Sequence, residues 1–163
     1  TYHFPGMRVL QFEFGQMSLV IDFPENSVVY TGTHDNDTLL GWFESLPISS
    51  DGNMLTQNKL LQYFQCTKEN VHWEIINYAL STASYMVMIQ LQDILGENSL
   101  ARFNTPGTLS PDNWSWRMEE GKLTKPLKTK LAKLTERHNR NISAVINLSK
   151  KIESYKKRCF LSR

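Results

Sequence analysis

The segment from Val28 to Pro47 constrains the fold of this chain more than any other. It opens on the β-branched and aromatic run Val28–Tyr30, which is typical of a short buried strand. Polar residues cluster at 33–38, and apolar residues then recur with helical spacing up to Pro47. A strand followed at once by a helix is half of a βαβ unit, so the segment indicates a parallel α/β fold.

The same alternation extends over most of the chain. The expected strands are 7–14, 27–33 and 85–91, although so short an apolar run as the last is also compatible with a helix. The expected helices are 37–46 capped by Asp37, 55–64, one capped by Thr67 that runs to Leu80, and 126–140. Three strands cannot close a barrel, which takes about 200 residues or more. The expected fold class is therefore α/β, a partial (β/α)8 TIM barrel made of its last three strands with their helices.

The composition fits one globular unit without a membrane span. The chain has 163 residues, 40% of them hydrophobic, which is enough for one modest domain. No apolar run approaches the roughly 20 residues that cross a bilayer, and the first residues lack the pattern of a signal peptide. We therefore expect a cytoplasmic protein whose two cysteines, Cys66 and Cys159, are reduced and structural. The first residue is Thr1 rather than Met, so we expect the chain to begin inside a longer protein.

Charge is distributed unevenly along the chain. Residues 1–121 carry 5 Lys and Arg against 14 Asp and Glu, a balance of −9, whereas residues 122–163 carry 13 against 2, a balance of +11. A basic end of this kind can bind nucleic acid or an anionic membrane. It can equally be a basic helix that packs on an acidic body. No nucleic-acid-binding motif accompanies the basic residues, so we expect neither a nucleic-acid nor a membrane partner.

His34 and Asp35 are the main candidates for chemistry, because they directly follow the second expected strand. In an α/β barrel, active sites are built at the carboxyl ends of the strands. An ionised Asp accepts hydrogen bonds from hydroxyl groups and a neighbouring His can donate one, as binding of a sugar ring requires. Two structural roles stay open, a helix cap for Asp35 and a buried core imidazole for His34. A metal site with Asp37 would need further ligands, and no second His lies nearby, so no metal is expected.

Three blocks of the sequence resemble the carboxyl-terminal part of the 4-α-glucanotransferases, the amylomaltases or disproportionating enzymes. The blocks are Phe4–Phe12, Val28–Thr38, and Ala101–Gly107 followed by Asn113–Arg117, with Gln92–Gly96 as a weaker fourth. The resemblance covers roughly residues 1–140. We therefore expect two parts, a carboxyl-terminal portion of the catalytic barrel at 1–140 and a basic tail of unknown role at 141–163.

The resemblance implies a barrel of which this chain holds the sixth, seventh and eighth strands. In enzymes related to the α-amylases, a third carboxylate after the seventh strand stabilises the transition state. Asp35 matches that residue, with His34 beside it. The nucleophilic Asp and the general-acid Glu would precede Thr1. Asn104 and Phe12 match family residues that line the substrate cleft.

The function that the resemblance implies is that of a glycosyltransferase of starch, glycogen or maltodextrin metabolism. It would transfer α-1,4-glucan segments between maltodextrins with retention of configuration, and would need no cofactor. This chain would supply the transition-state-stabilising part of the site and would be inactive alone, with the missing amino-terminal half of the barrel as its partner. The alternative is a non-catalytic glucan-binding chain or a degenerate remnant of the enzyme. Trp42, Trp114 and Trp116 can stack on sugars but are more often core residues, so they are left outside the expected site.

Overall fold

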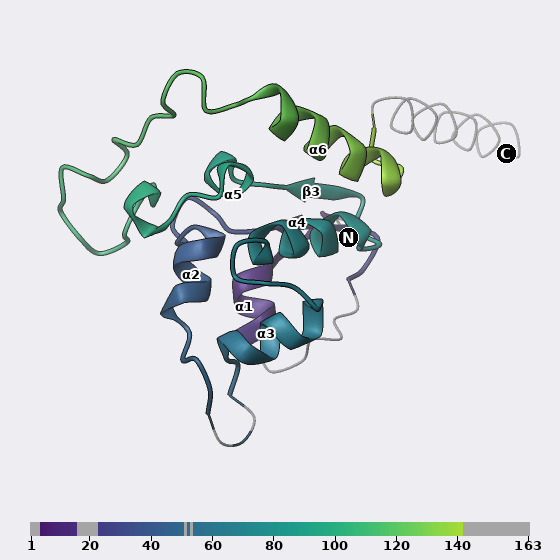
Figure 1. Ribbon diagram of the computed structural model, residues 1–163, viewed down its shortest axis with the longest axis horizontal. Coiled ribbons are helices and arrows are strands. Elements are labelled where there is room, and N and C mark those ends of the chain that lie inside the picture. Colours follow the sequence, from purple (N-terminus) through teal and green to yellow (C-terminus); the bar gives the residue numbers. More distant parts are fainter. Residues whose placement is uncertain (1–3, 16–22, 51, 53, 142–163) are drawn as a thin grey trace, which may run out of the picture.

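The computed structural model describes residues 4–15, 23–50, 52 and 54–141 (Figure 1). Its sheet has three parallel strands in the order β1-β2-β3. The strands are β1 (Gly6–Val9), β2 (Ser27–Tyr30) and β3 (Met86–Met88). All three begin within a residue of where they were expected, and each is shorter than expected. The prediction of a parallel α/β fold is confirmed.

The helices follow the strands in alternation, as the sequence predicted. In the described part of the chain they are α1 (Leu10–Gly15), α2 (Leu39–Ser45), α3 (Gln57–Phe64), α4 (Val71–Ser81), α5 (Leu91–Leu95) and α6 (Lys125–Arg137), with a 3-10 turn at Ser99–Ala101. The long segment between that turn and α6 contains no helix or strand. None of the helices in the described part of the chain has the length and apolar character that crossing a membrane takes.

The prediction of one strand over 7–14 is wrong beyond Val9, because the chain turns into α1 at Leu10. Leu10 and Phe14 are four residues apart and fully buried, so they lie on one face of a helix. Phe14 packs in the core beside the rings of Trp42, Phe64 and Tyr78. The alternating apolar and polar residues of this segment mimicked a strand, and packing around Phe14 decided in favour of the helix.

Two expected helix caps are also wrong. The side chain of Thr38, not Asp37, caps α2, because its hydroxyl accepts a hydrogen bond from the Gly41 N–H at 3.0 Å. The fourth helix begins after Asn70 rather than after Thr67, and no side chain caps it. Ser, Thr, Asp and Asn all satisfy the first N–H groups of a helix, so neighbouring candidates are not separated by residue type alone.

The helices pack on one face of the sheet and leave the other face open. The buried face includes Val29, which is fully buried and belongs to the same core cluster as the apolar residues of α4. On the opposite face, Met7 and Met86 each pair with Val28 in one cross-strand row, and both methionines are more than two-fifths exposed. Met88, on the next row, is 48% exposed. The open face is therefore apolar.

Helix α6 carries five of the 13 basic residues of 122–163. It packs on the rest of the domain, so for this described part of the segment the interpretation as a packed basic helix holds. Its leucines Leu127, Leu131 and Leu134 face the core, against α4 and α5. The Nζ atom of Lys130 lies 4.3 Å from the centre of the Trp73 ring, a cation–π contact. Cys66 is free and packs at the edge of the core, where burial raises the pKa of its thiol. Cys159 lies outside the described residues.

Arg140, just after α6, ties the end of this helix to the amino-terminal edge of the sheet. Its guanidinium donates to the carbonyls of Leu80, Thr82 and Ser84 at 2.6–2.8 Å. The Ser84 hydroxyl lies 2.6 Å from that of Ser27, where β2 begins. The last described residues are therefore held at the edge of the sheet opposite to the carboxyl ends of the strands.

Replacing Arg140 with alanine should lower the free energy of unfolding by about 2 kcal/mol, because three carbonyls lose a charged donor. Chemical denaturation of the 163-residue chain, followed by circular dichroism, measures the change. Arg137→Ala is the matched control, since Arg137 is exposed and its removal should change the free energy of unfolding by less than about 0.5 kcal/mol. Equal effects of the two substitutions would contradict the assigned role of Arg140.

Candidate functional site

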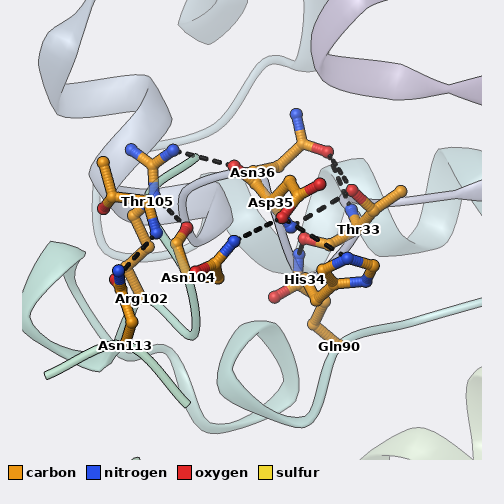
Figure 2. Close-up of polar contacts among 9 residues, drawn as sticks. All are labelled: Thr33, His34, Asp35, Asn36, Gln90, Arg102, Asn104, Thr105 and Asn113. Atoms are coloured by element: carbon orange, nitrogen blue, oxygen red, sulfur yellow. Dashed lines mark hydrogen bonds and ion pairs between the residues drawn. The ribbon is translucent and has the colours of Figure 1, made fainter. Parts of the chain in front are cut away.

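A tight turn after β2 displays His34 and Asp35 (Figure 2). The Asn36 side chain closes the turn, because its Oδ1 accepts from both the N–H and the hydroxyl of Thr33, at 2.9 and 2.7 Å. The Gln90 amide, from the residue before α5, donates to the Thr33 carbonyl at 2.9 Å. The turn is thus held by its own residues and by the neighbouring strand end, and its two tip residues point outward.

Asp35 is an exposed carboxylate with side-chain partners. Its Oδ1 accepts a hydrogen bond from the Asn104 amide at 2.6 Å and lies 3.4 Å from the Nε2 of His34. The side chains of Asp35 and His34 are 47% and 57% exposed. No backbone N–H of the described residues donates to the Asp35 carboxylate, and α2 is capped by Thr38 instead. The alternatives of a helix cap for Asp35 and a core imidazole for His34 are therefore wrong.

Asp37 points away from this pair. Its carboxylate accepts from the Ser99 hydroxyl and from the Thr38 N–H, both at 2.7 Å. Across the described ranges, no group of three His, Cys, Asp or Glu residues is placed to hold a metal ion. Asp37 therefore joins the turn to the segment that precedes Arg102, and it also lines the hollow that contains Asp35.

Arg102 is a site residue that the sequence did not single out. Its guanidinium donates to the carbonyl of Asp35 at 2.8 Å and to the carbonyl of Asn104 at 2.9 Å, so it joins the two loops (Figure 2). A planar guanidinium can serve two acceptors at fixed angles, which a lysine cannot do in the same way. The signal that could have pointed to Arg102 is its place two residues before Asn104, in the third block of the resemblance.

The four expected site residues surround the carboxyl ends of the strands, but they do not share one hollow. Asp35 and Phe12 line a hollow of about 560 Å³ with Arg102, and Phe12 is 61% exposed at its edge. Asn104 faces a second hollow, of about 480 Å³, on the other side of its hydrogen bond to Asp35. The polar contacts join Asp35 with His34 and Asn104, whereas Phe12 borders the first hollow without a polar contact to the others.

Asp93 is a buried residue that holds both sides of the turn, and the sequence did not single it out. It is 1% exposed, and its two oxygens accept from the Thr31 hydroxyl at 2.6 Å and from the Leu39 N–H at 2.7 Å. Burial raises the pKa of the Asp93 carboxyl to about 6, and the nearby charge of Asp37 acts in the same direction. Asp93 therefore links the end of β2 to the start of α2, on both sides of the turn. Only its place in the weak fourth block gave a hint of it.

The side chains of the site indicate the class of ligand that it suits. A carboxylate, an imidazole and a carboxamide meet at the solvent-facing carboxyl ends of parallel strands, the position where α/β enzymes place their active sites. Exposed groups that both donate and accept hydrogen bonds, beside an exposed aromatic ring, suit a ligand rich in hydroxyl groups. The site therefore has the character of a carbohydrate site in an α/β enzyme.

Comparison with known proteins specifies the family. The family model described as 4-alpha-glucanotransferase matches residues 1–124, and the chain belongs to this family. It is 41% identical over 147 residues to the 4-alpha-glucanotransferase of a Synechocystis species, covering 86% of this chain and 28% of that protein. It is 43% identical over 136 residues to the chloroplastic/amyloplastic 4-alpha-glucanotransferase of Oryza sativa subsp. japonica, covering 81% of this chain and 22% of that protein.

A solved structure gives the same result. An amylomaltase from Streptococcus agalactiae, in complex with acarbose, superimposes with a TM-score of 0.73 at 30% sequence identity, covering 85% of this chain and 28% of that one. The chain thus spans only about a quarter of the length of the relatives that it matches. The resemblance that the sequence motifs indicated is confirmed at the level of the family.

Proposed function

We propose that this chain is the carboxyl-terminal part of the catalytic barrel of a 4-α-glucanotransferase, with the barrel portion at 1–140 and a basic tail at 141–163. Three parallel strands, each followed by a helix, support the barrel portion, as does the small share of the relatives' length that the chain covers. The intact enzyme would cleave an α-1,4 bond of a maltodextrin, hold the glucosyl part as a covalent intermediate and transfer it to the 4-hydroxyl of another glucan. The names of the relatives support α-1,4-glucans as the substrates.

Asp35 has the central role in this proposal. The transition state of retaining transfer resembles an oxocarbenium ion, and hydrogen bonds to ring hydroxyls that strengthen in it lower the barrier by several kcal/mol. The free lone pairs of Asp35 can accept such bonds, and His34 beside it can donate one to a neighbouring hydroxyl. The observation that carries the proposal is the exposed Asp35 carboxylate at the end of β2, 3.4 Å from the His34 imidazole and 2.6 Å from the Asn104 amide. Asn104 and Phe12 would contact further parts of the glucan.

The free edges of the two outer strands are evidence for an amino-terminal partner segment. Within the described residues, β1 and β3 each pair only with β2, so each has one free edge. Free strand edges and an open apolar face, here with Met7 and Met86, are surfaces that proteins normally cover. The remaining strands of a family-length barrel would pair with both edges and bury this face. A cytoplasmic location stays a prediction for this chain, and the rice relative carries a chloroplastic/amyloplastic name.

The purified 163-residue chain should not disproportionate maltotriose, because the nucleophile and general acid that the family uses are expected before Thr1. Mixing it with the amino-terminal fragment of a relative that carries the remaining strands should restore glucose release. Glucose production by the chain alone would contradict the proposal. The alternative of a non-catalytic glucan-binding chain is favoured if no mixture becomes active but added maltoheptaose still changes the tryptophan fluorescence of the chain. Acarbose, the compound named in the solved complex, serves as a second titrant.

A further inference from the structure

Trp114 is an exposed aromatic residue beside the candidate site, and the role proposed above for Asp35 does not use it. Its ring centre lies 5.1 Å from that of His34, with the planes tilted by 38°. The Phe103 ring also contacts it, in a T-shaped arrangement with the ring centres 5.1 Å apart. Trp114 is nevertheless 52% exposed, whereas Trp73 in the core is 6% exposed. Trp114 is therefore supported by packing and still open to solvent.

The backbone at Trp114 adopts a conformation that bulky residues rarely adopt. Its φ angle is +64°, in the left-handed region that favours glycine. The Trp114 N–H donates to the Phe103 carbonyl at 2.7 Å, which holds this conformation in place. Strained backbone of this kind concentrates where a side chain must be presented in one direction for a function.

The loop that carries Trp114 is built around a hollow with sugar-binding chemistry. Trp114 and Asn104 line the same hollow of about 480 Å³, together with the hydroxyl residues Thr108 and Ser110. Asn113 fixes the loop, because its side chain accepts from the Thr105 N–H at 3.0 Å and donates to the carbonyl and hydroxyl of Thr108 at 3.2 and 3.1 Å. A half-exposed indole next to amide and hydroxyl groups offers one apolar face and several hydrogen-bonding partners, which suits a sugar ring.

We propose that Trp114 is the aromatic wall of a second glucosyl-binding position, separated from the one at Asp35 by the hydrogen bond between Asp35 and Asn104. This inference rests on the proposed function, and it specifies how many sugar units the chain holds. Asp35 and Phe12 contact one unit of an α-1,4-glucan, and Trp114 stacks on a unit further along. Trp114 also packs on His34, so it supports the imidazole that lies beside Asp35.

Calorimetric titration of the 163-residue chain with maltose and with maltoheptaose tests this inference. The unchanged chain should bind maltoheptaose more tightly than maltose, because only the longer glucan reaches both positions. Trp114→Leu should weaken binding of maltoheptaose by roughly tenfold, in line with loss of a buried aromatic anchor, and leave binding of maltose within about twofold. Trp114→Phe keeps an aromatic face and should retain most of the preference. Trp116→Leu, on the same loop but lining neither hollow, is the matched control and should leave both affinities within about twofold.

The outcomes separate this inference from the function on which it rests. An unchanged preference for maltoheptaose in Trp114→Leu, with binding intact, overturns the role of Trp114 and leaves the proposed function standing. Failure of the unchanged chain to bind either sugar overturns the inference, whereas the proposed function is overturned only if mixing with the amino-terminal segment also restores no activity. If Trp114→Leu does not fold, the indole N–H resonance of Trp114, assigned by its absence in Trp114→Phe, replaces it. That resonance should shift with maltoheptaose and not with maltose, and equal shifts with both sugars overturn the inference.

Discussion

Asp35→Asn should reduce glucan transfer by about 10³-fold when this chain is combined with the amino-terminal segment of the barrel. The substitution keeps the size of the side chain and can keep the contact with Asn104, but it removes the negative charge that faces the developing positive charge of the transition state. Loss of several kcal/mol of transition-state stabilisation corresponds to this factor, since each tenfold in rate is about 1.4 kcal/mol. Initial rates of glucose release from maltotriose measure it.

The way in which the kinetic constants change distinguishes this role from a binding role. An interaction that strengthens only in the transition state lowers kcat and kcat/KM together and leaves KM nearly unchanged. Asp112→Asn is the matched control, because it makes the same chemical change on an exposed residue of the loop before α6. It should leave kcat within about twofold. If Asp35→Asn raised KM and left kcat intact, Asp35 would be a ground-state binding residue and its proposed role would be wrong.

Among the buried polar side chains next to the site, Asp93 should contribute most to the free energy of unfolding. Asp93→Ala should lower the free energy of unfolding by about 3 kcal/mol at pH 4.5, where the carboxyl is largely neutral. The loss arises because the Leu39 N–H and the Thr31 hydroxyl are left without their buried acceptor. Asp93→Asn keeps an acceptor for Leu39 and should cost less than about 1 kcal/mol. Urea unfolding of the three chains gives the comparison, with Asp112→Ala as an exposed control.

Two large pKa shifts, those of Asp93 and His72, make opposing contributions to the pH dependence of stability. The pKa of Asp93 rises from 3.8 to about 6 on folding, so its contribution is complete below pH 3.8 and is lost as the pH rises through 6, about 3 kcal/mol in all. Burial, together with the charge of Lys130, lowers the pKa of His72 from 6.5 to about 4. The His72 contribution is therefore complete above pH 6.5 and is lost as the pH falls through 4. The two trends oppose each other over the same range.

The unchanged chain should consequently show a shallow stability profile between pH 4 and pH 6.5. Asp93→Asn removes one trend, so its stability should rise steadily with pH over that range. His72→Phe removes the other, so its stability should fall as the pH rises. Urea midpoints at several pH values test both statements. Parallel profiles for all three chains would show that neither group changes its pKa on folding.

The sequence predicted the features that depend on local pattern. The run Val28–Tyr30 forms the central strand, and the polar residues after it form a turn that presents His34 and Asp35 to solvent. Helical spacing of Leu127, Leu131 and Leu134 predicted which face of α6 meets the core. These predictions succeeded because the period of the apolar residues matches the geometry of the element.

What the sequence did not predict depends on contacts between distant residues. The segment Leu10–Phe14 alternates like a strand, and only the rings around Phe14 make it helical. Apart from their places in the blocks of the resemblance, nothing in the local sequence pointed to Arg102 and Asp93. Arg102 donates to the Asp35 carbonyl 67 residues away, and Asp93 accepts from the Leu39 N–H 54 residues away. Trp114 has the residue type of a core aromatic, and its exposure follows from the fold of its loop rather than from its neighbours in sequence.

The anchorage of Arg140 has a practical consequence for handling this protein. Because its guanidinium binds the carbonyls that precede β3, the last described residues lie on the side of the domain remote from Asp35. An affinity tag or fluorophore joined directly after Asn141, in place of residues 142–163, would therefore be attached on that far side. Immobilising the molecule on a sensor chip by that end would leave the sugar-facing edge turned toward the flowing solution.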